Sequence, residues 1–168
     1  MWTTRVTTST LASMVVAGGV TALALLSQQP RSPRAAVVIS EVTSDGDDRI
    51  ELYNTGTTPA RLDGWSVVDS DPSHTPYELP RGTTLAPGDY LVLRRGEAHD
   101  FGLGEADGLM LRDADGNTVD TTSWYADAAS PSWCRLAESG VMVTCESASF
   151  GGPSRDVAPL AVLGPGHD

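Results

Sequence analysis

The side chains of this sequence that could do chemistry are mainly carboxylates. The densest group is Asp113, Asp115, Asn117 and Asp120, whose spacing superficially resembles a calcium-binding loop. A helix–loop–helix calcium site requires Gly at its sixth position and a bidentate acid at its twelfth. Counted from Asp113, the Gly is fourth and Trp124 is twelfth, so this motif is rejected. We interpret the stretch as a hairpin turn, with adventitious calcium binding as the alternative.

The remaining candidates for catalysis are incomplete. The acids of 45–48 and 69–71 are interpreted as parts of solvated turns. There is no Gly-x-Ser-x-Gly elbow, no His pair at zinc spacing and no lysine for a phosphate-binding loop. Glu41 and Glu51 are expected on neighbouring strands, where they would form a carboxylate pair or accept hydrogen bonds from backbone groups or Arg. The sequence therefore predicts a protein that is not an enzyme, with no catalytic, cofactor-binding or metal-ligating residues.

The two cysteines, Cys134 and Cys145, have two interpretations. In an exported protein they allow a single intramolecular disulfide, which an oxidising compartment would form. A reactive thiol would instead need a basic partner, and His74, His99 and His167 are all distant in sequence. The disulfide is therefore the prediction.

Composition narrows the range of partners. The 168 residues carry a formal net charge of −11, from 22 acids against 11 basic residues. An acidic surface repels phosphate backbones and anionic lipid, which disfavours binding to nucleic acid or to a membrane surface. Protein or a cell-envelope polymer is the expected partner, and membrane contact is expected only through the N-terminal segment if that segment is retained.

The N-terminal part is laid out like an export signal. Arg5 lies in a short polar head, and Leu11–Leu26 is largely apolar before a polar exit. Residues 1–27 are therefore predicted to be a signal peptide or a membrane anchor, and cleavage is preferred because the run falls short of the roughly 20 residues of a comfortable span. Residues 28–36 form a linker and 154–168 a disordered tail. The predicted location is secreted or in the cell envelope.

After residue 36 the pattern changes to short strands. β-Branched and aromatic residues alternate with Gly, Pro, Asn and Asp clusters, and no segment has helical periodicity over ten or more residues. An antiparallel all-β sandwich follows from this punctuation. Pro76 and Pro80 mark Tyr77–Leu79 as an edge strand, whereas the unbroken apolar run Tyr90–Leu93 predicts a strand covered on both faces. The expected strands are Val37–Val42, Arg49–Asn54, Trp65–Val68, Tyr77–Leu79, Tyr90–Leu93, Leu109–Leu111 and Thr118–Thr121.

Alternation also separates core residues from surface residues. Trp65 restarts the apolar pattern behind a Gly and is expected to anchor the space between two sheets. Trp124, Tyr125 and Trp133 would either form an exposed aromatic platform for sugar or peptide, or at least one of them fills the space between the sheets. For Trp133 the core is preferred, whereas the Ala and Ser neighbours of Trp124 and Tyr125 indicate a loop and make these two the candidate binding surface. The predicted core consists of Ile39, Ile50, Leu52, Trp65, Leu91, Leu111 and Trp133.

The order of these elements resembles the lamin tail domain family. The resemblance covers about residues 37 to 153 and depends on the succession of short motifs rather than on any single one. Those motifs are Ile39–Val42, Ile50–Asn54, Leu62–Trp65, Leu85–Tyr90, Leu109–Asp120 and Ser132–Arg135.

The resemblance implies an immunoglobulin-like β-sandwich of the bacterial, secreted type. Bacterial members occur as non-catalytic modules, sometimes beside phosphoesterase or nuclease domains. This sequence contains neither a coiled-coil rod nor an enzyme domain, and its Phe150–Pro153 ending follows the family's Pro-Gly ending only loosely. We therefore expect an exported, non-catalytic binding module. A small secreted hydrolase, using acids and a divalent cation on phosphoesters or glycosides, is the alternative.

Overall fold

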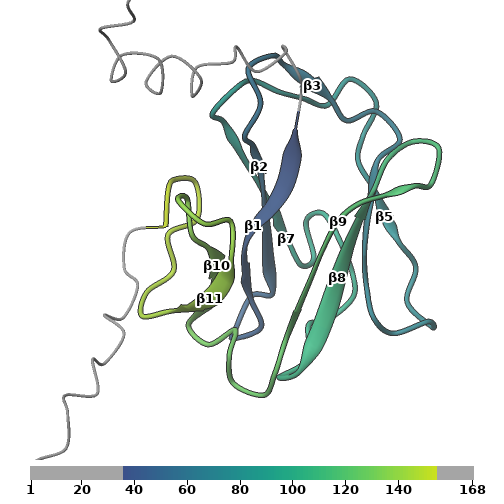
Figure 1. The fold of residues 1–168 in the computed structure, drawn as a ribbon. Coiled ribbons are helices and arrows are strands. Elements are labelled where there is room, and N and C mark those ends of the chain that lie inside the picture. The colour runs from purple at the N-terminus through teal and green to yellow at the C-terminus, as the bar shows by residue number, and fades with distance from the viewer. Residues whose placement is uncertain (1–35, 155–168) are drawn as a thin grey trace, which may run out of the picture. The chain divides into compact units, whose positions relative to one another are not determined.

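The computed structural model describes residues 36–154, which form strands joined by turns and contain no helix (Figure 1). The predicted signal or anchor of 1–27 lies outside the described residues, as do nearly all of the predicted linker and tail. The strands are β1 (Val37–Thr43), β2 (Arg49–Asn54), β3 (Ala60–Arg61), β4 (Ser66–Asp69), β5 (Tyr77–Glu78), β6 (Thr84–Leu85), β7 (Tyr90–Arg94), β8 (Asp107–Arg112), β9 (Thr118–Trp124), β10 (Ser132–Arg135) and β11 (Met142–Cys145).

The strands form two main antiparallel sheets. The first has the order β11-β10-β1-β2-β7 and the second the order β5-β4-β8-β9, while β3 and β6 make a small separate pair. The two layers face one another in Figure 1, and residues of both contribute to one hydrophobic core. The predicted all-β, immunoglobulin-like sandwich is confirmed.

Alternating side chains explain which face of the first sheet is buried. Ile39 lies opposite Leu52, which in turn lies opposite Leu91, so these three point into the core together. The register of β1 shifts between Ile39 and Glu41, at a bulge around Ser40. Between these two pairs β1 advances two residues while β2 advances one. Glu41 therefore lies directly opposite Glu51 on the outer face.

The densest acidic cluster forms the turn of the β8–β9 hairpin. Asp113 accepts hydrogen bonds from the backbone amides of Asp115 (3.0 Å) and Asn117 (2.8 Å). Gly116 adopts a φ of 81°, which only glycine takes without strain. Hydrogen bonding from Asn117 lowers the pKa of the Asp113 carboxyl. This acid organises the turn, as the sequence predicts.

The predicted core residues occupy two kinds of position. Ile39, Ile50, Leu52 and Leu111 are fully buried. Trp65, Leu91 and Trp133 are half-buried and pack against the rim of the core. Trp65 precedes β4 rather than starting it, and its carbonyl accepts the amide of Leu79 at 2.8 Å. It therefore packs against the core from the side rather than filling its middle.

The strand of Tyr90–Leu93 is the clearest correction. The sequence predicts that both faces of this strand are covered by other parts of the protein. In the structure β7 is the last strand of its sheet. Leu93 is buried, whereas Tyr90, Leu91 and Val92 are only half-buried. An unbroken apolar run normally indicates two covered faces, so this edge exposes more apolar surface than the pattern predicts.

A polar bridge closes the opposite side of the sandwich. The Asp120 carboxylate of β9 accepts the amide of Ile39 at 2.8 Å and the Arg135 guanidinium at 2.6 Å. Arg135 also donates to the Ile39 carbonyl at 2.8 Å. The backbone of β1 beyond its pairing with β10 is thus satisfied by side chains from β9 and β10.

Candidate functional site

Glu41 and Glu51 form the first candidate site. Both side chains are fully buried although they lie on the outer face of the first sheet. Their cover is the segment after β11: Glu41 accepts the Ser149 amide at 2.9 Å and the Ser149 hydroxyl at 2.8 Å. Glu51 accepts the Gly151 amide, and its other oxygen accepts the Ser40 hydroxyl at 2.7 Å. The two carboxylates therefore hold the closing segment, which we define as residues 147–153.

Phe150 adds a further contact between the closing segment and the sheet. The guanidinium carbon of Arg49 lies 4.4 Å from the Phe150 ring centroid, in cation–π geometry. Of the two roles open to the glutamates in the sequence, the structure favours acceptance of backbone hydrogen bonds. Both carboxylates accept hydrogen bonds from the closing segment, and Glu51 also binds a hydroxyl of the neighbouring strand.

The burial of Glu51 makes a prediction about pH. Desolvation raises the pKa of its carboxyl above the ordinary value of 4.5, against the opposing effect of hydrogen bonds from Gly151 and Ser40. The stability that this shift contributes is complete below 4.5 and is lost as pH rises through the raised value. In urea unfolding across this range, the stability of the wild type relative to Glu51→Gln is therefore expected to decline as pH increases.

The variant isolates this residue because Gln is neutral throughout and keeps an acceptor for Gly151. Titrating groups that do not interact with Glu51 contribute equally to the wild type and the variant, so they cancel in the difference. A difference that stays constant with pH would contradict the assignment.

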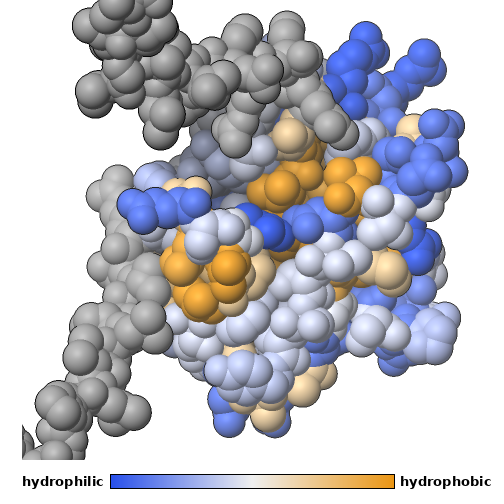
Figure 2. Space-filling view, viewed as in Figure 1, coloured by the Kyte–Doolittle hydropathy of each residue, from blue (hydrophilic) through white to orange (hydrophobic). Residues whose placement is uncertain are grey.

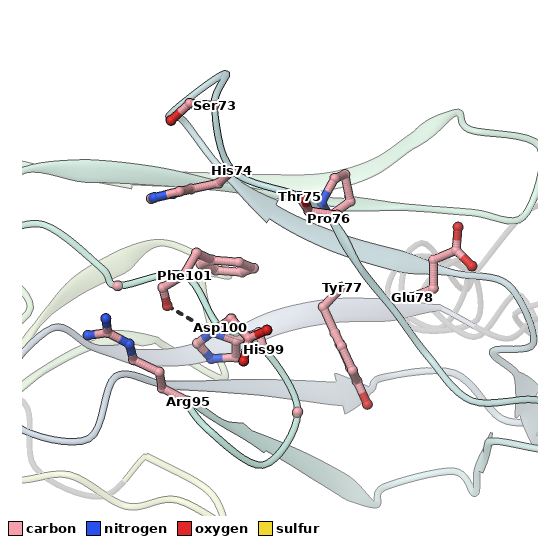
Figure 3. Close-up of a pocket in the computed structure, with 12 residues that line it drawn as sticks. Ser73, His74, Thr75, Pro76, Tyr77, Glu78, Arg95, His99, Asp100 and Phe101 are labelled. Carbon is pink, nitrogen blue, oxygen red and sulfur yellow. Dashed lines mark hydrogen bonds between the residues drawn. The ribbon is translucent and has the colours of Figure 1, made fainter.

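The second candidate site is a hollow of about 630 Å³ at one end of the sandwich (Figure 3). One wall is the loop leading into β5 and the other is the segment after β7. His74 lines the first wall, and its Nδ1 lies 2.6 Å from the carboxylate of buried Asp69. This hydrogen bond raises the pKa of His74. The sequence signal for this pair is weak: a five-residue spacing between Asp69 and His74 across a turn.

The second wall is built on stacked rings. His99 is buried, its Nδ1 lies 3.0 Å from the Phe101 carbonyl, and the two rings stack at 4.3 Å. Burial lowers the pKa of His99. Arg95 pairs with Asp48 at 2.9 Å and lies so close to Gly102 that a Cβ there would be 2.9 Å from its guanidinium. These contacts fix the wall, and Tyr77 faces it from β5 (Figure 3).

Comparison with known families identifies the chain. The model of the lamin tail domain matches residues 30–126. The chain belongs to the lamin tail domain family. The match includes both glutamates and the hollow, and it ends before β10, so the disulfide and the closing segment lie beyond it. None of the curated proteins matches this sequence significantly.

In this lamin tail domain the predicted binding pair is divided between core and surface. Trp124 is 5% exposed, so its assignment to an exposed surface is wrong. It is the last residue of β9, on the inward face with Thr122, and its Nε1 donates to the Gly104 carbonyl at 2.9 Å. Tyr125 is 68% exposed and meets Trp133 edge-on at 6.0 Å. Alternation along the strand thus overrides the small, polar neighbours that indicated a loop.

Apart from Tyr125, the exposed apolar side chains do not form one continuous surface on the face shown in Figure 2. The face seen in Figure 2 is mostly hydrophilic, with separate apolar patches, one of them over the β10–β11 hairpin. Cys134 and Cys145 of that hairpin form the predicted disulfide, with Cα atoms 6.0 Å apart. Within residues 36–154 no three His, Cys, Asp or Glu side chains are placed to hold a metal ion. The same residues include no helix of a length and hydropathy that would cross a membrane.

Proposed function

We propose that this lamin tail domain is an exported, non-catalytic module that binds a protein or a cell-envelope polymer. The observation that carries the proposal is that its two buried, facing glutamates accept hydrogen bonds from the closing segment, a structural role rather than a catalytic one. Glu41 and Glu51 are the only fully buried acids opposite one another in the described strands, and both are occupied by the closing segment. The Cys134–Cys145 disulfide agrees with export, because disulfides persist in oxidising compartments.

Binding is supported by the shape of the module rather than by reactive groups. A rigid sandwich that presents hollows between loops is the usual platform for recognition. The hollow beside His74 combines Tyr77 with charged groups such as Arg95 and Glu78. Such a mixture of ring and polar side chains suits an extended partner that carries both apolar and polar groups.

The alternative, a small secreted hydrolase, is favoured by one specific feature. A buried Asp bonded to Nδ1 of a partly exposed His is the arrangement that orients a general base. The nearby hydroxyls are engaged elsewhere: Ser73 donates to Asp71 at 2.7 Å and Ser70 to Asp107 at 2.5 Å. No Ser–His hydrogen bond completes the dyad among the described residues.

The two functions predict opposite results with the purified protein. We expect no turnover of generic phosphoester or glycoside substrates above the level of the His74→Ala variant, with or without chelator. We expect saturable co-sedimentation of the wild type with insoluble envelope material. Turnover that requires His74, or that a chelator abolishes, would favour the hydrolase instead.

A further inference from the structure

The outer edge of β7 presents unpaired backbone groups. The amide of Asn54 donates to the Asp89 carbonyl, and the amide of Arg95 donates to the Asp48 carbonyl, so residues 89 and 95 both face β2. Because backbone groups alternate in direction along an antiparallel strand, the N–H and C=O groups of Tyr90 and Val92 must point away from β2. β7 is the last strand of its sheet. The N–H and C=O groups of Tyr90 and Val92 are therefore available to another strand.

Two other edges of the sandwich are protected. β5 is two residues long and lies between Pro76 and Pro80, which is how natural sheets blunt an edge. β9 is bridged to β1 through Asp120. β7 has neither a proline nor a bulge, and its sequence Tyr-Leu-Val-Leu-Arg has high β-propensity. Its edge is open by comparison.

A side-chain pocket lies directly beside this edge. A hollow of about 250 Å³ runs between β7 and the β5 segment, and Tyr77 and Ala98 also line the larger hollow of Figure 3. The two hollows thus follow one seam between the edge strands of the two sheets. The lining of the smaller one is largely apolar and includes Tyr77, Leu79, Pro80, Leu91, Leu93 and Ala98.

We propose that β7 binds an extended polypeptide segment of a partner protein, which adds to the first sheet as a sixth strand. Alternate side chains of such a segment point toward the core side of the sheet, so apolar residues at every second position would fill the hollow beside Leu91. A polysaccharide could not pair with the regularly spaced amides and carbonyls of Tyr90 and Val92. This inference rests on the proposed binding function and names its partner.

Charge adds a second feature to the partner. Glu78, Glu97 and Asp100 line the two hollows and are exposed, in a chain of net charge −11. Arg94 and Arg95 line the same hollows, but they pair with Asp47 and Asp48. A peptide with Arg or Lys beside its apolar positions complements this rim. The recognised segment is therefore short, extended, alternately apolar and basic at its ends.

The decisive variant is Val92→Pro. Proline removes the outward N–H of residue 92 but no bond to β2, so an edge strand accepts it. The matched control is Val92→Ala, which keeps the N–H. The probe is a displayed library of random peptides, selected on the wild type, with enriched peptides synthesised and titrated by NMR. We expect alternately apolar, basic peptides whose affinity falls roughly tenfold or more in Val92→Pro and little in Val92→Ala.

Each other outcome overturns the inference. A selection without enriched peptides would exclude a peptide ligand. Equal binding to Val92→Pro, or NMR shift changes centred on β9 or β11, would place the site elsewhere. A concentration-dependent dimer that Val92→Pro abolishes would make a second copy of this chain the occupant. If envelope material still co-sediments with Val92→Pro as with the wild type, the edge assignment fails while the proposed function stands. Matching urea unfolding of both variants establishes that they are folded.

Discussion

Replacing Cys134 and Cys145 together with Ala is expected to lower the free energy of unfolding by about 3 kcal/mol. The disulfide joins residues 11 apart in sequence, and in the chain-entropy account its removal restores conformations to the unfolded chain. This is a large share of the stability of a small domain. Urea unfolding of the double variant and the wild type under oxidising conditions measures the change.

Reduction of the wild-type protein provides the internal comparison. It should produce the same loss as the double variant, while Glu138→Ala, an exposed change inside the same loop, should alter stability by less than about 0.5 kcal/mol. One residue separates Cys145 from the closing segment, so release of the disulfide should also loosen the contacts of Ser149 and Gly151 with the glutamates. Equal stability of the oxidised and reduced protein would contradict this account.

The sequence predicts the layers of this fold better than their edges. Period-two alternation places Ile39, Ile50 and Leu52 in the core because each sits on a strand with partners on both sides. The same alternation cannot show whether a strand is central or terminal in its sheet. Tyr90–Leu93 therefore looks covered in the sequence, although β7 ends the sheet and Leu91 remains half-buried.

The candidate sites were only partly accessible to sequence reasoning. The approach of Glu41 and Glu51 follows from two adjacent strands, and the structure places them opposite one another. Their partner, the closing segment, lies about a hundred residues further on, and a contact of that separation leaves no local pattern. Trp124 shows the converse case, since its small neighbours indicated a loop while the strand of β9 extended to include it.

Asp120→Ala is expected to destabilise the domain by about 2 kcal/mol, because it leaves two largely buried donors without this acceptor. Asp120 is the shared acceptor of the Ile39 amide and the Arg135 guanidinium, and both ionic side chains are less than one-fifth exposed. An exposed ion pair would contribute little, but here the pair also satisfies the backbone of β1. Loss of the carboxylate should therefore cost more than the loss of charge alone.

The matched control is Asp115→Ala, which removes an exposed acid from the turn of the same hairpin, where only its backbone amide is bonded. It should change stability by less than about 0.5 kcal/mol. Hydrogen exchange adds a local readout, because the Ile39 amide should lose protection in Asp120→Ala and keep it in Asp115→Ala. If both variants unfold alike, the bridge does not close this side of the sandwich, and the contrast between a closed β9 side and an open β7 edge would lose its physical basis.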